Sequence, residues 1–368
     1  MSKIEKILGD SALKVFKGFV LEKDITLTKD DLGKINKIII IVRHQLGDML
    51  CSLPMMFSVR KFFPEAQITL VSKSSAGFSE IFENCSSPPV NNVIHYEHGF
   101  EKFVDTVKLL TNFSPDLAIV PSSVIFSATN HLLAYYSKAQ YRVGVRSKDY
   151  ILNKIGYTLN IKKDFLWDSK KVHQVNRNLD VIKQIGIEPA ENFINLSLNQ
   201  EQIDFSAQFY ADNFSDPQKS VIGIHPGAAK EGNVWPQEKF AELMNLFNKK
   251  LNVYFYISEG PADKKYVENL ENILKTKYPG IKYSKYCGKL MYNAANISKT
   301  ALFISNDTGI MHLASGFKIP VIGLFGPTKA YEWGPLGVNK ASIQAQGGKI
   351  ENIEISDVFE TGIGCLSV

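Results

Sequence analysis

The stretch 303–328 reads FISNDTGIMHLASGFKIPVIGLFGPT, and two of its apolar runs are each followed by a polar or glycine-rich turn. A short apolar run is ambiguous by periodicity alone, but the polar stop after the first run favours a strand. Because ligands of open α/β sheets bind at the carboxyl ends of strands, both turns are candidate binding turns. The expected elements are a strand at 301–304, a polar stop at 305–309, a helix from 311 to about Gly316, a strand at 320–325 and a closing turn at 326–328.

The polar residues of the first turn have two interpretations. Asp307 could accept a hydrogen bond from a sugar or ribose hydroxyl, and Thr308 could donate one to a phosphate oxygen at the helix N-terminus. Alternatively, either residue only caps the helix, which is the commoner role of such a residue taken by itself. The whole stretch, with its two successive turns, favours the binding interpretation.

The gross composition favours a two-domain, soluble-type chain. At 368 residues it exceeds the usual size of a single core. The net charge of +5 is spread along the chain, so we expect no nucleic-acid partner. The four cysteines are far apart and form no CxxC pair, which is typical of a reducing compartment rather than of a zinc site or a disulfide framework. We therefore expect a cytoplasmic protein with no signal peptide and no membrane span.

The N-terminal segment 3–21 places Ile4, Leu8, Phe16 and Phe19 at helical spacing, with lysines largely off that stripe. Such a basic amphipathic helix could lie on the inner face of the cytoplasmic membrane or pack on the protein's own domain. Both interpretations remain open, and contact with the inner membrane is a hypothesis.

The first core strand is KIIIIV at 37–42, and its polar exit is RHQLGD at 43–48. We expect a helix over 49–63, irregular at Pro54, and a second strand at 67–71. This is a βαβ unit of Rossmann type, but its turn lacks the GxGxxG pattern. Asp48 puts a carboxylate where a pyrophosphate would need room, which argues against a nicotinamide or flavin enzyme.

The second half repeats the pattern, with a strand at 220–224 and the exit HPGAAK at 225–230. We therefore predict an α/β protein with two Rossmann-like parallel-sheet domains facing each other across a cleft. The first domain is 1–200, including an N-terminal extension at 1–36, and the second is 201–368. Further elements are expected as strands at 92–95, 117–120, 141–145, 194–198, 252–257 and 281–283, and as helices at 100–112, 126–138, 173–185, 199–219, 237–249 and 293–298.

Three stretches, at 38–71, at 222–240 and at 303–328, together resemble glycosyltransferase family 9, the heptosyltransferases of lipopolysaccharide core assembly. The first has an apolar strand, an arginine, Gly-Asp and a later Phe-Pro, and the second has HPGA followed by Trp-Pro. The third has NDTG, MHLA and LFGPT. Their order and spacing cover most of the chain between 37 and 337.

The resemblance implies a GT-B fold and inverting transfer of a sugar, typically heptose from ADP-heptose, onto a glycolipid or oligosaccharide acceptor. It implies neither a metal nor a cofactor. It makes Asp48 the general base, with Arg43, Gln45 and Gly47 as acceptor-side candidates. The donor-binding candidates are Asp307, Thr308, Gly309, His312, Gly227, Ala228, Lys230, Gly326 and Thr328.

The chain departs from the family pattern where a lysine commonly precedes the Trp-Pro by two residues, because Asn233 stands there. Lys230 is near enough in sequence to supply the charge. The segment after Trp333 also matches poorly. Two alternatives follow. The first is an enzyme of the same fold that uses another nucleotide-sugar donor, and the second is a nucleotide-sugar-binding protein whose catalytic site has decayed.

From the residues alone, Asp48 is equally well interpreted as a helix cap or as a base, and the resemblance favours the base. An inverting transfer needs one carboxylate to take the acceptor's proton, while the departing diphosphate is already a stable anion. Other positions keep two interpretations, as ligand contacts or as structural residues: His44, Arg60, His225, Trp235, His312 and Trp333.

Overall fold

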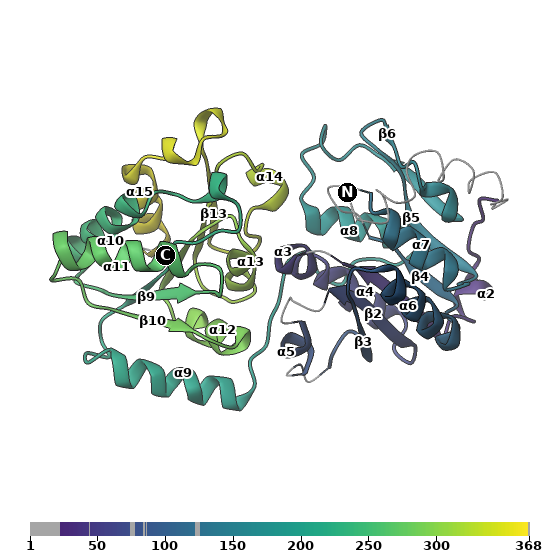
Figure 1. The fold of residues 1–368 in the computed structure, drawn as a ribbon, viewed down its shortest axis with the longest axis horizontal. Coiled ribbons are helices and arrows are strands. Elements are labelled where there is room, and N and C mark those ends of the chain that lie inside the picture. The colour runs from purple at the N-terminus through teal and green to yellow at the C-terminus, as the bar shows by residue number, and fades with distance from the viewer. Residues whose placement is uncertain are drawn as a thin grey trace. The chain divides into compact units, whose positions relative to one another are not determined.

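The structure is a computed structural model that describes residues 23–366 apart from His44, 74–77, Asn84, Ser86 and 122–125. The predictions for the segment 3–21 and for His44 lie outside these residues. The chain forms two compact units. The first ends at Asn192 and the second begins at Phe193, except that Glu83–Cys85 is grouped with the second. Figure 1 shows both, coloured from purple to yellow along the sequence.

The first unit is built on a seven-stranded sheet with the order β3-β2-β1-β4-β5-β6, in which β7 also pairs with β5. All pairs are parallel except β5 with β6. Its strands are β1 (Lys37–Val42), β2 (Gln67–Lys73), β3 (Asn92–Tyr96), β4 (Leu117–Ile119), β5 (Tyr141–Lys148), β6 (Ile151–Leu152) and β7 (Ile161–Phe165). Its helices are α2 (Lys29–Leu32), α3 (Leu46–Leu50), α4 (Leu53–Phe62), α5 (Phe78–Glu83), α6 (Phe100–Phe113), α7 (Ala128–Tyr136), the 3-10 turn η1 (Gly156–Thr158) and α8 (Gln174–Lys183).

Strand β1 is central because five consecutive β-branched residues bury both of its faces. Ile39 and Ile41 pack with residues of α6 and α7 on one side of the sheet. The strand is fixed at its start by the Asp116 carboxylate, whose Oδ2 accepts the N–H groups of Asn36 at 2.8 Å and Lys37 at 2.9 Å. Asp116 precedes β4, so this carboxylate joins the entries of two neighbouring strands.

The single helix expected over 49–63 is wrong. Helix α3 ends at Leu50 and α4 begins at Leu53, with a turn at Cys51 and Ser52 between them. Pro54 lies in the first turn of α4, where its missing N–H removes no helical hydrogen bond. The break allows the short helix α3, which carries Asp48, to have its own direction at the end of β1.

The second unit has a six-stranded, fully parallel sheet with the order β10-β9-β8-β11-β12-β13. Its strands are β8 (Val221–His225), β9 (Tyr254–Glu259), β10 (Tyr283–Cys287), β11 (Leu302–Asn306), β12 (Val321–Phe325) and β13 (Lys340–Gln344). Its helices are α9 (Gln200–Asn213), η2 (Glu231–Asn233), α10 (Gln237–Leu251), α11 (Lys264–Lys277), α12 (Leu290–Ser298), α13 (Gly309–Ser315), α14 (Ala330–Trp333), η3 (Gln346–Gly348), η4 (Ile350–Asn352) and α15 (Ile355–Leu366).

Alternating side chains of the second sheet form its main core. Ile222, Ile304 and Leu324 pack with residues of α10, α11 and α15, which lie together in Figure 1. The strand expected at 194–198 is wrong, because this segment has no strand partner. Instead, the Leu196 N–H donates to the Gly316 carbonyl at the end of α13. The segment is therefore an extended connector that packs on the second unit.

A buried polar network in the first unit centres on His131 of α7. Its Nδ1 lies 2.7 Å from the Ser127 carbonyl, and its Nε2 lies 2.8 Å from Asn153 Nδ2. Because Asn153 Nδ2 is a donor, these contacts fit a neutral ring that donates from Nδ1 and accepts at Nε2. Burial lowers the pKa of His131 from 6.5 to about 4.

Protonation of His131 should therefore couple folding to pH. The unfolded histidine has the higher pKa, so it binds a proton first as the pH falls, and the unfolding free energy falls between pH 6.5 and about pH 4. The loss attributable to this residue is about 3 kcal/mol. We expect urea titrations at several pH values to show it in the wild type and to lack it in His131→Gln. Subtracting the two curves removes the other titrating groups, and parallel curves would contradict the assignment.

Candidate functional site

The polar turns predicted to bind ligand in the second unit lie at one edge of its sheet. Strand β11 lies between β8 and β12, and all three run in the same direction. Their carboxyl ends therefore bring together the turn 226–230, the turn at Asp307 and the turn 326–328. Residues about 80 to 100 positions apart in the chain thus form one candidate site.

The buried side chain of Asn306 joins two of these turns. Its Nδ2 donates to the carbonyl oxygens of Pro226 at 3.0 Å and Gly227 at 3.1 Å, and its Oδ1 accepts the Trp235 N–H at 3.1 Å. Asn306 is fully buried, so these bonds satisfy main-chain groups that water does not reach. The turn after β8 is thereby fixed to the end of β11.

Asn233, at the position of the family's lysine, joins the turn at Asp307 to the turn 326–328. Its Nδ2 donates to Asp307 Oδ2 at 3.0 Å and to Thr328 Oγ1 at 3.3 Å. The residue is 5% exposed, and within the described ranges its Oδ1 has no hydrogen-bond partner. Asn233 therefore connects the turns but brings no positive charge. Lys230 lies exposed on the neighbouring turn.

The residues that follow Asp307 have structural contacts of their own. Thr308 caps α13 by accepting the Met311 N–H at 3.4 Å, and Gly309 is the first residue of that helix. His312 is 3% exposed and packs edge-on against Trp333 of α14, with 6.1 Å between ring centroids. The structure thus contains the hydrogen bond that the capping interpretation of Thr308 requires and the ring contact that the packing interpretation of His312 requires.

The glycine turn after β8 lies against a buried carboxylate. A Cβ atom on Gly227 would be 2.0 Å from Asp263 Oδ1, so a larger residue there would force the turn or Asp263 to shift. Asp263 Oδ2 accepts the Gly260 N–H at 2.8 Å and lies 3.7 Å from His225 Nε2. Burial lowers the pKa of His225, although Asp263 acts in the opposite direction. The neighbouring Ala228 is buried as well.

Gly326 also allows a close approach of two main chains. A Cβ atom there would be 2.7 Å from the Gly232 carbonyl, and the Gly326 carbonyl accepts from Gln344 Nε2 at 2.7 Å. The turn after β12 is thus held against the 230–234 loop. Trp235, which follows this loop, is fully buried in the core.

In the first unit, the candidate base Asp48 lies at the N-terminus of α3. Its Oδ2 accepts the Gln45 N–H at 3.3 Å, as in a capping box. The turn that follows is fixed by Asn178 of α8, whose Nδ2 donates to the Cys51 carbonyl and to Ser52 Oγ, each at 3.1 Å. Asp48 and Gly47 remain half-buried. The capping interpretation is realised, and it leaves the role as a base untested.

Arg43 leaves β1 and is held by two side chains that the sequence did not indicate. Its guanidinium lies 3.9 Å from the centre of the Tyr96 ring, and its Nη1 donates to Asn130 Oδ1 at 3.1 Å. Tyr96 ends β3 and Asn130 belongs to α7, so the arginine is fixed at the carboxyl edge of the sheet. This geometry fixes a cation at the edge of the sheet from which the half-buried Gly47 and Asp48 turn also leaves.

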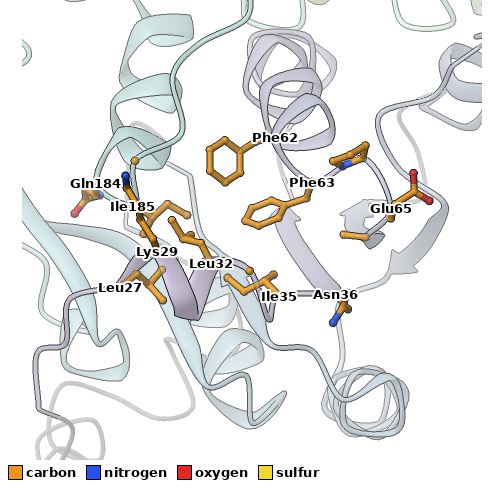
Figure 2. A pocket seen from close by; sticks show the side chains of 14 residues that line it. Leu27, Lys29, Leu32, Ile35, Asn36, Phe62, Phe63, Glu65, Gln184 and Ile185 are labelled. Carbon is orange, nitrogen blue, oxygen red and sulfur yellow. The ribbon is translucent and has the colours of Figure 1, made fainter.

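Arg60 does not belong to this edge. Its Nη1 donates to the carbonyl oxygens of Pro64 and Ala66, so it closes the C-terminal end of α4. Beside this end lies a hollow of ≈ 720 Å³, shown in Figure 2, which Leu32, Ile35, Phe62, Phe63 and Ile185 help to line. It lies at the amino ends of β1 and β2, at the edge of the sheet opposite to the one that carries Asp48.

Two absences hold for the described part of the chain. Within it, no cluster of three or more histidine, cysteine or acidic side chains is placed to hold a metal ion. No helix of these ranges is long and apolar enough to cross a membrane.

Several residues that shape the two edges escaped the sequence interpretation. Asn306 was visible in the NDTG motif, but nothing in the sequence indicated that its side chain would hold another turn. Asp263 lies far from Gly227 in the chain, and only the fold brings them together. Tyr96 and Asn130 likewise gave no local signal of their contact with Arg43.

Two Rossmann-like sheets, one with glycine and polar turns joined at adjacent strand ends, define a two-domain α/β class of protein. The family model for glycosyltransferase family 9 (heptosyltransferase) matches residues 107–361, well over half of the chain. The chain therefore belongs to glycosyltransferase family 9, and the predicted glycosyltransferase activity is confirmed.

Two characterised relatives and one solved structure illustrate the similarity. The lipooligosaccharide heptosyltransferase 2 of Campylobacter jejuni is 25% identical over 304 residues, which is 81% of this chain and 83% of that protein. The lipopolysaccharide core heptosyltransferase OpsX of Haemophilus influenzae is 25% identical, over 76% of each chain.

The structure of Escherichia coli heptosyltransferase WaaC with ADP gives a TM-score of 0.67 at 17% identity, covering 89% of this chain and 99% of that one. This likeness confirms the predicted fold class of two parallel α/β domains of the GT-B type.

Replacing Gly227 should damage the candidate site. In Gly227→Ala the new methyl group would meet the Asp263 carboxylate, so the turn or Asp263 must move. We expect a loss of about 1–3 kcal/mol in unfolding free energy and weaker ADP binding by calorimetry. The matched control is Gly232→Ala, where the nearest atom outside the immediate chain would be Pro327 Cγ at 3.7 Å, an ordinary contact. Equal ADP affinity in the two variants would argue against a role of the turn in binding.

Proposed function

We propose that this protein transfers heptose from ADP-heptose to a lipopolysaccharide or lipooligosaccharide core acceptor, with inversion at the anomeric carbon. The donor binds to the second unit, and Asp48 of the first unit is the general base. The main support is the joined set of turns in which Asn233 links Asp307 to Thr328. The similarity to lipooligosaccharide and lipopolysaccharide core heptosyltransferases supports heptose and such an acceptor, and the similarity to WaaC, whose structure was determined with ADP, supports this nucleotide.

The donor turns offer groups suited to a nucleoside diphosphate sugar. The glycine turn 226–230 brings main-chain N–H groups, and Lys230 brings a charge near the leaving diphosphate. Asp307 is an acceptor for sugar or ribose hydroxyls, and the Asn233 amide orients it. Because burial lowers the pKa of His225, the imidazole is neutral at pH 7 and leaves the charge to other groups.

On the acceptor side, the carboxylate of Asp48 takes the proton of the attacking hydroxyl as the sugar is transferred. The diphosphate departs as a stable anion, so the reaction requires no acidic partner for it. Arg43, held by Tyr96 and Asn130, is an acceptor-side contact together with Gln45 and Gly47. We propose no metal and no resident cofactor.

Two alternatives remain distinct from this proposal. Another nucleotide-sugar donor is favoured by the neutral Asn233 in place of a lysine. A decayed binding protein is disfavoured, since Asn233 is integrated into the site through two hydrogen bonds to candidate donor residues.

Nucleotide binding separates these alternatives. We expect ADP to raise the thermal unfolding midpoint of the full chain and UDP, GDP and NAD to leave it unchanged. A ligand at about 100 times its dissociation constant stabilises by about 2.7 kcal/mol. A shift with UDP or GDP instead would support another donor, and no shift with any nucleotide would contradict donor binding.

The role of Asp48 is tested by Asp48→Asn. An asparagine can still accept the Gln45 N–H, so the variant removes the charge and keeps the cap. We expect ADP affinity to be retained and turnover of ADP-heptose with a truncated core acceptor to fall by a factor of about 100 or more.

The matched control is Ser52→Ala, which removes the hydrogen bond from Ser52 Oγ to the Asp48 carbonyl in the same turn. It should lower stability but keep turnover near that of the wild type. Wild-type turnover in Asp48→Asn would exclude this residue as the base.

A further inference from the structure

The hairpin of β5 and β6 ends in three consecutive bulky apolar residues that are open to solvent. Tyr150 is 88% exposed, Ile151 63% and Leu152 62%. Single exposed apolar side chains are common, but contiguous ones mark interaction surfaces. We call residues 149–152 the hairpin tip. No part of the proposed catalytic or donor site uses it.

The hairpin tip has a defined conformation. Asp149 and Tyr150 have φ values of 47° and 66°, in the left-handed region that a tyrosine seldom adopts. The Asp149 carboxylate accepts the N–H groups of Asp168 at 2.9 Å and Ser169 at 3.3 Å. The main-chain N–H of Asp149 donates to the Phe165 carbonyl at 2.8 Å. These bonds hold a strained turn in the arrangement that displays the apolar side chains.

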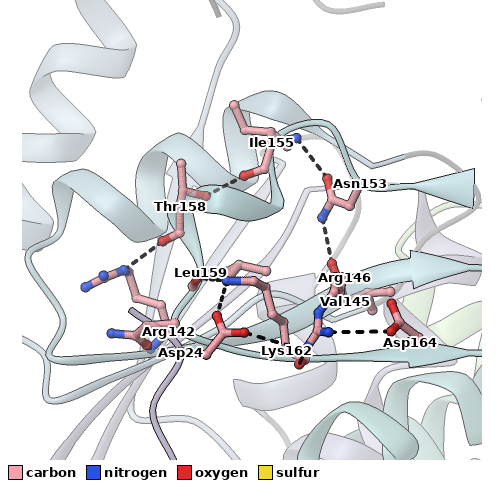
Figure 3. Close-up of polar contacts among 11 residues, drawn as sticks. Asp24, Arg142, Val145, Arg146, Asn153, Ile155, Thr158, Leu159, Lys162 and Asp164 are labelled. Atoms are coloured by element: carbon pink, nitrogen blue, oxygen red, sulfur yellow. Dashed lines mark hydrogen bonds and ion pairs between the residues drawn. The ribbon is translucent and has the colours of Figure 1, made fainter. Parts of the chain in front are cut away.

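The base of the hairpin is braced as well, as Figure 3 shows. Asn153 donates from Nδ2 to the Val145 carbonyl and from its main-chain N–H to the Arg146 carbonyl, each at 2.8 Å. Arg146 also pairs with Asp24 at 3.5 Å and with Asp164 at 3.6 Å. The hairpin tip is therefore a fixed projection of the first unit.

The segments that flank the hairpin tip are basic. The nearby carboxylates are all engaged: Asp149 with main-chain N–H groups, Asp164 with Arg146, and Asp168 with Arg177 at 2.7 Å. The exposed lysines of these segments are Lys154, Lys163, Lys170 and Lys171. An apolar tip flanked by lysines matches the boundary of an anionic bilayer in both polarity and charge.

The hairpin tip also lies on the same edge of the sheet as Asp48. The register through β4 pairs Ile40 with Ile119 and Ile119 with Val143, which places Val42 level with Val145. Strand β5 continues three residues further, to Lys148, or about 10 Å at the usual rise. The tip thus projects beyond the edge on which the candidate base lies.

We propose that the hairpin tip docks the protein on an anionic membrane surface. Tyr150, Ile151 and Leu152 enter the interfacial layer, and the flanking lysines contact anionic headgroups. A second copy of the chain fits less well, because it would bring the same lysines together. The proposed function explains why a membrane is at hand, since the acceptor is a glycolipid, but the test below contains neither donor nor acceptor.

The test is co-sedimentation of the full chain with vesicles of phosphatidylethanolamine and phosphatidylglycerol. Tyr150→Asn, Ile151→Ser and Leu152→Ser are combined, with asparagine chosen because it tolerates the left-handed turn. We expect the partition coefficient to fall by a factor of about ten or more. The matched control combines Phe62→Ser and Val338→Ser, at side chains 42% and 84% exposed elsewhere, and should partition like the wild type.

Two further variants examine the two parts of the surface. Lys163→Gln, Lys170→Gln and Lys171→Gln together should weaken binding to these vesicles several-fold and reduce its dependence on salt. In Tyr150→Trp the indole emission should shift to shorter wavelength when vesicles are added, measured as the difference from the wild type, whose Trp167 and Trp235 are buried and whose Trp333 is half-buried.

Unchanged partition of the tip variant would overturn the proposal. So would loss of binding only when residues 1–22 are removed, or a change from dimer to monomer in the tip variant without an effect on vesicles. Retained ADP binding and retained turnover of a soluble acceptor by the tip variant would show that the variant folds. A failed docking result would then leave the proposed function intact.

Discussion

The side-chain amide of Asn306 is the contact on which the candidate site of the second unit depends. It satisfies three main-chain groups of the segment between β8 and α10, where no regular secondary structure could do so. Without this amide, the buried carbonyl oxygens of Pro226 and Gly227 would each lose a hydrogen-bond donor. Because Asn306 ends the central strand β11, the position of the glycine turn is set by the sheet itself. The Asn233 contacts with Asp307 and Thr328 then complete a site whose three turns have one common reference.

The parts of the fold that were predictable from the sequence are those specified locally. The buried runs at 37–42 and 221–225, each ended by a polar turn, indicate parallel strands without any knowledge of their neighbours. The break between α3 and α4 was misjudged because Pro54 is compatible with either an irregular helix or a new first turn. The segment 194–198 alternates apolar and polar residues, yet it packs by its apolar side on α13 rather than joining a sheet. Periodicity describes burial, not hydrogen-bond partners.

The residues of the candidate site also fall into two groups, those that a local motif indicates and those that only the fold brings together. The candidate ligand-binding residues lie in short motifs that the sequence displays, whereas those that support them, Asp263 under Gly227 and Tyr96 under Arg43, are distant in sequence. Judged by charge alone, Asn233 lacks the cation that a lysine would bring to this position. In the structure its amide makes two hydrogen bonds that define the spacing of Asp307 and Thr328. A neutral connector and a cationic one can thus occupy one position while changing the electrostatic potential felt by a diphosphate.

The Asp116 carboxylate has a consequence for the order of folding. Its hydrogen bonds to Asn36 and Lys37, at the start of β1, span 80 and 79 residues of chain. Strand β4, which follows Asp116, pairs with Ile38, Ile39 and Ile40 of β1. Such a distant closure is slow compared with helix formation. A nascent chain that has not yet emerged beyond Ile119 therefore carries an open edge of isoleucines, which is a template for mispairing. The first unit should be most vulnerable to aggregation during synthesis over this interval, well before any part of the second unit exists.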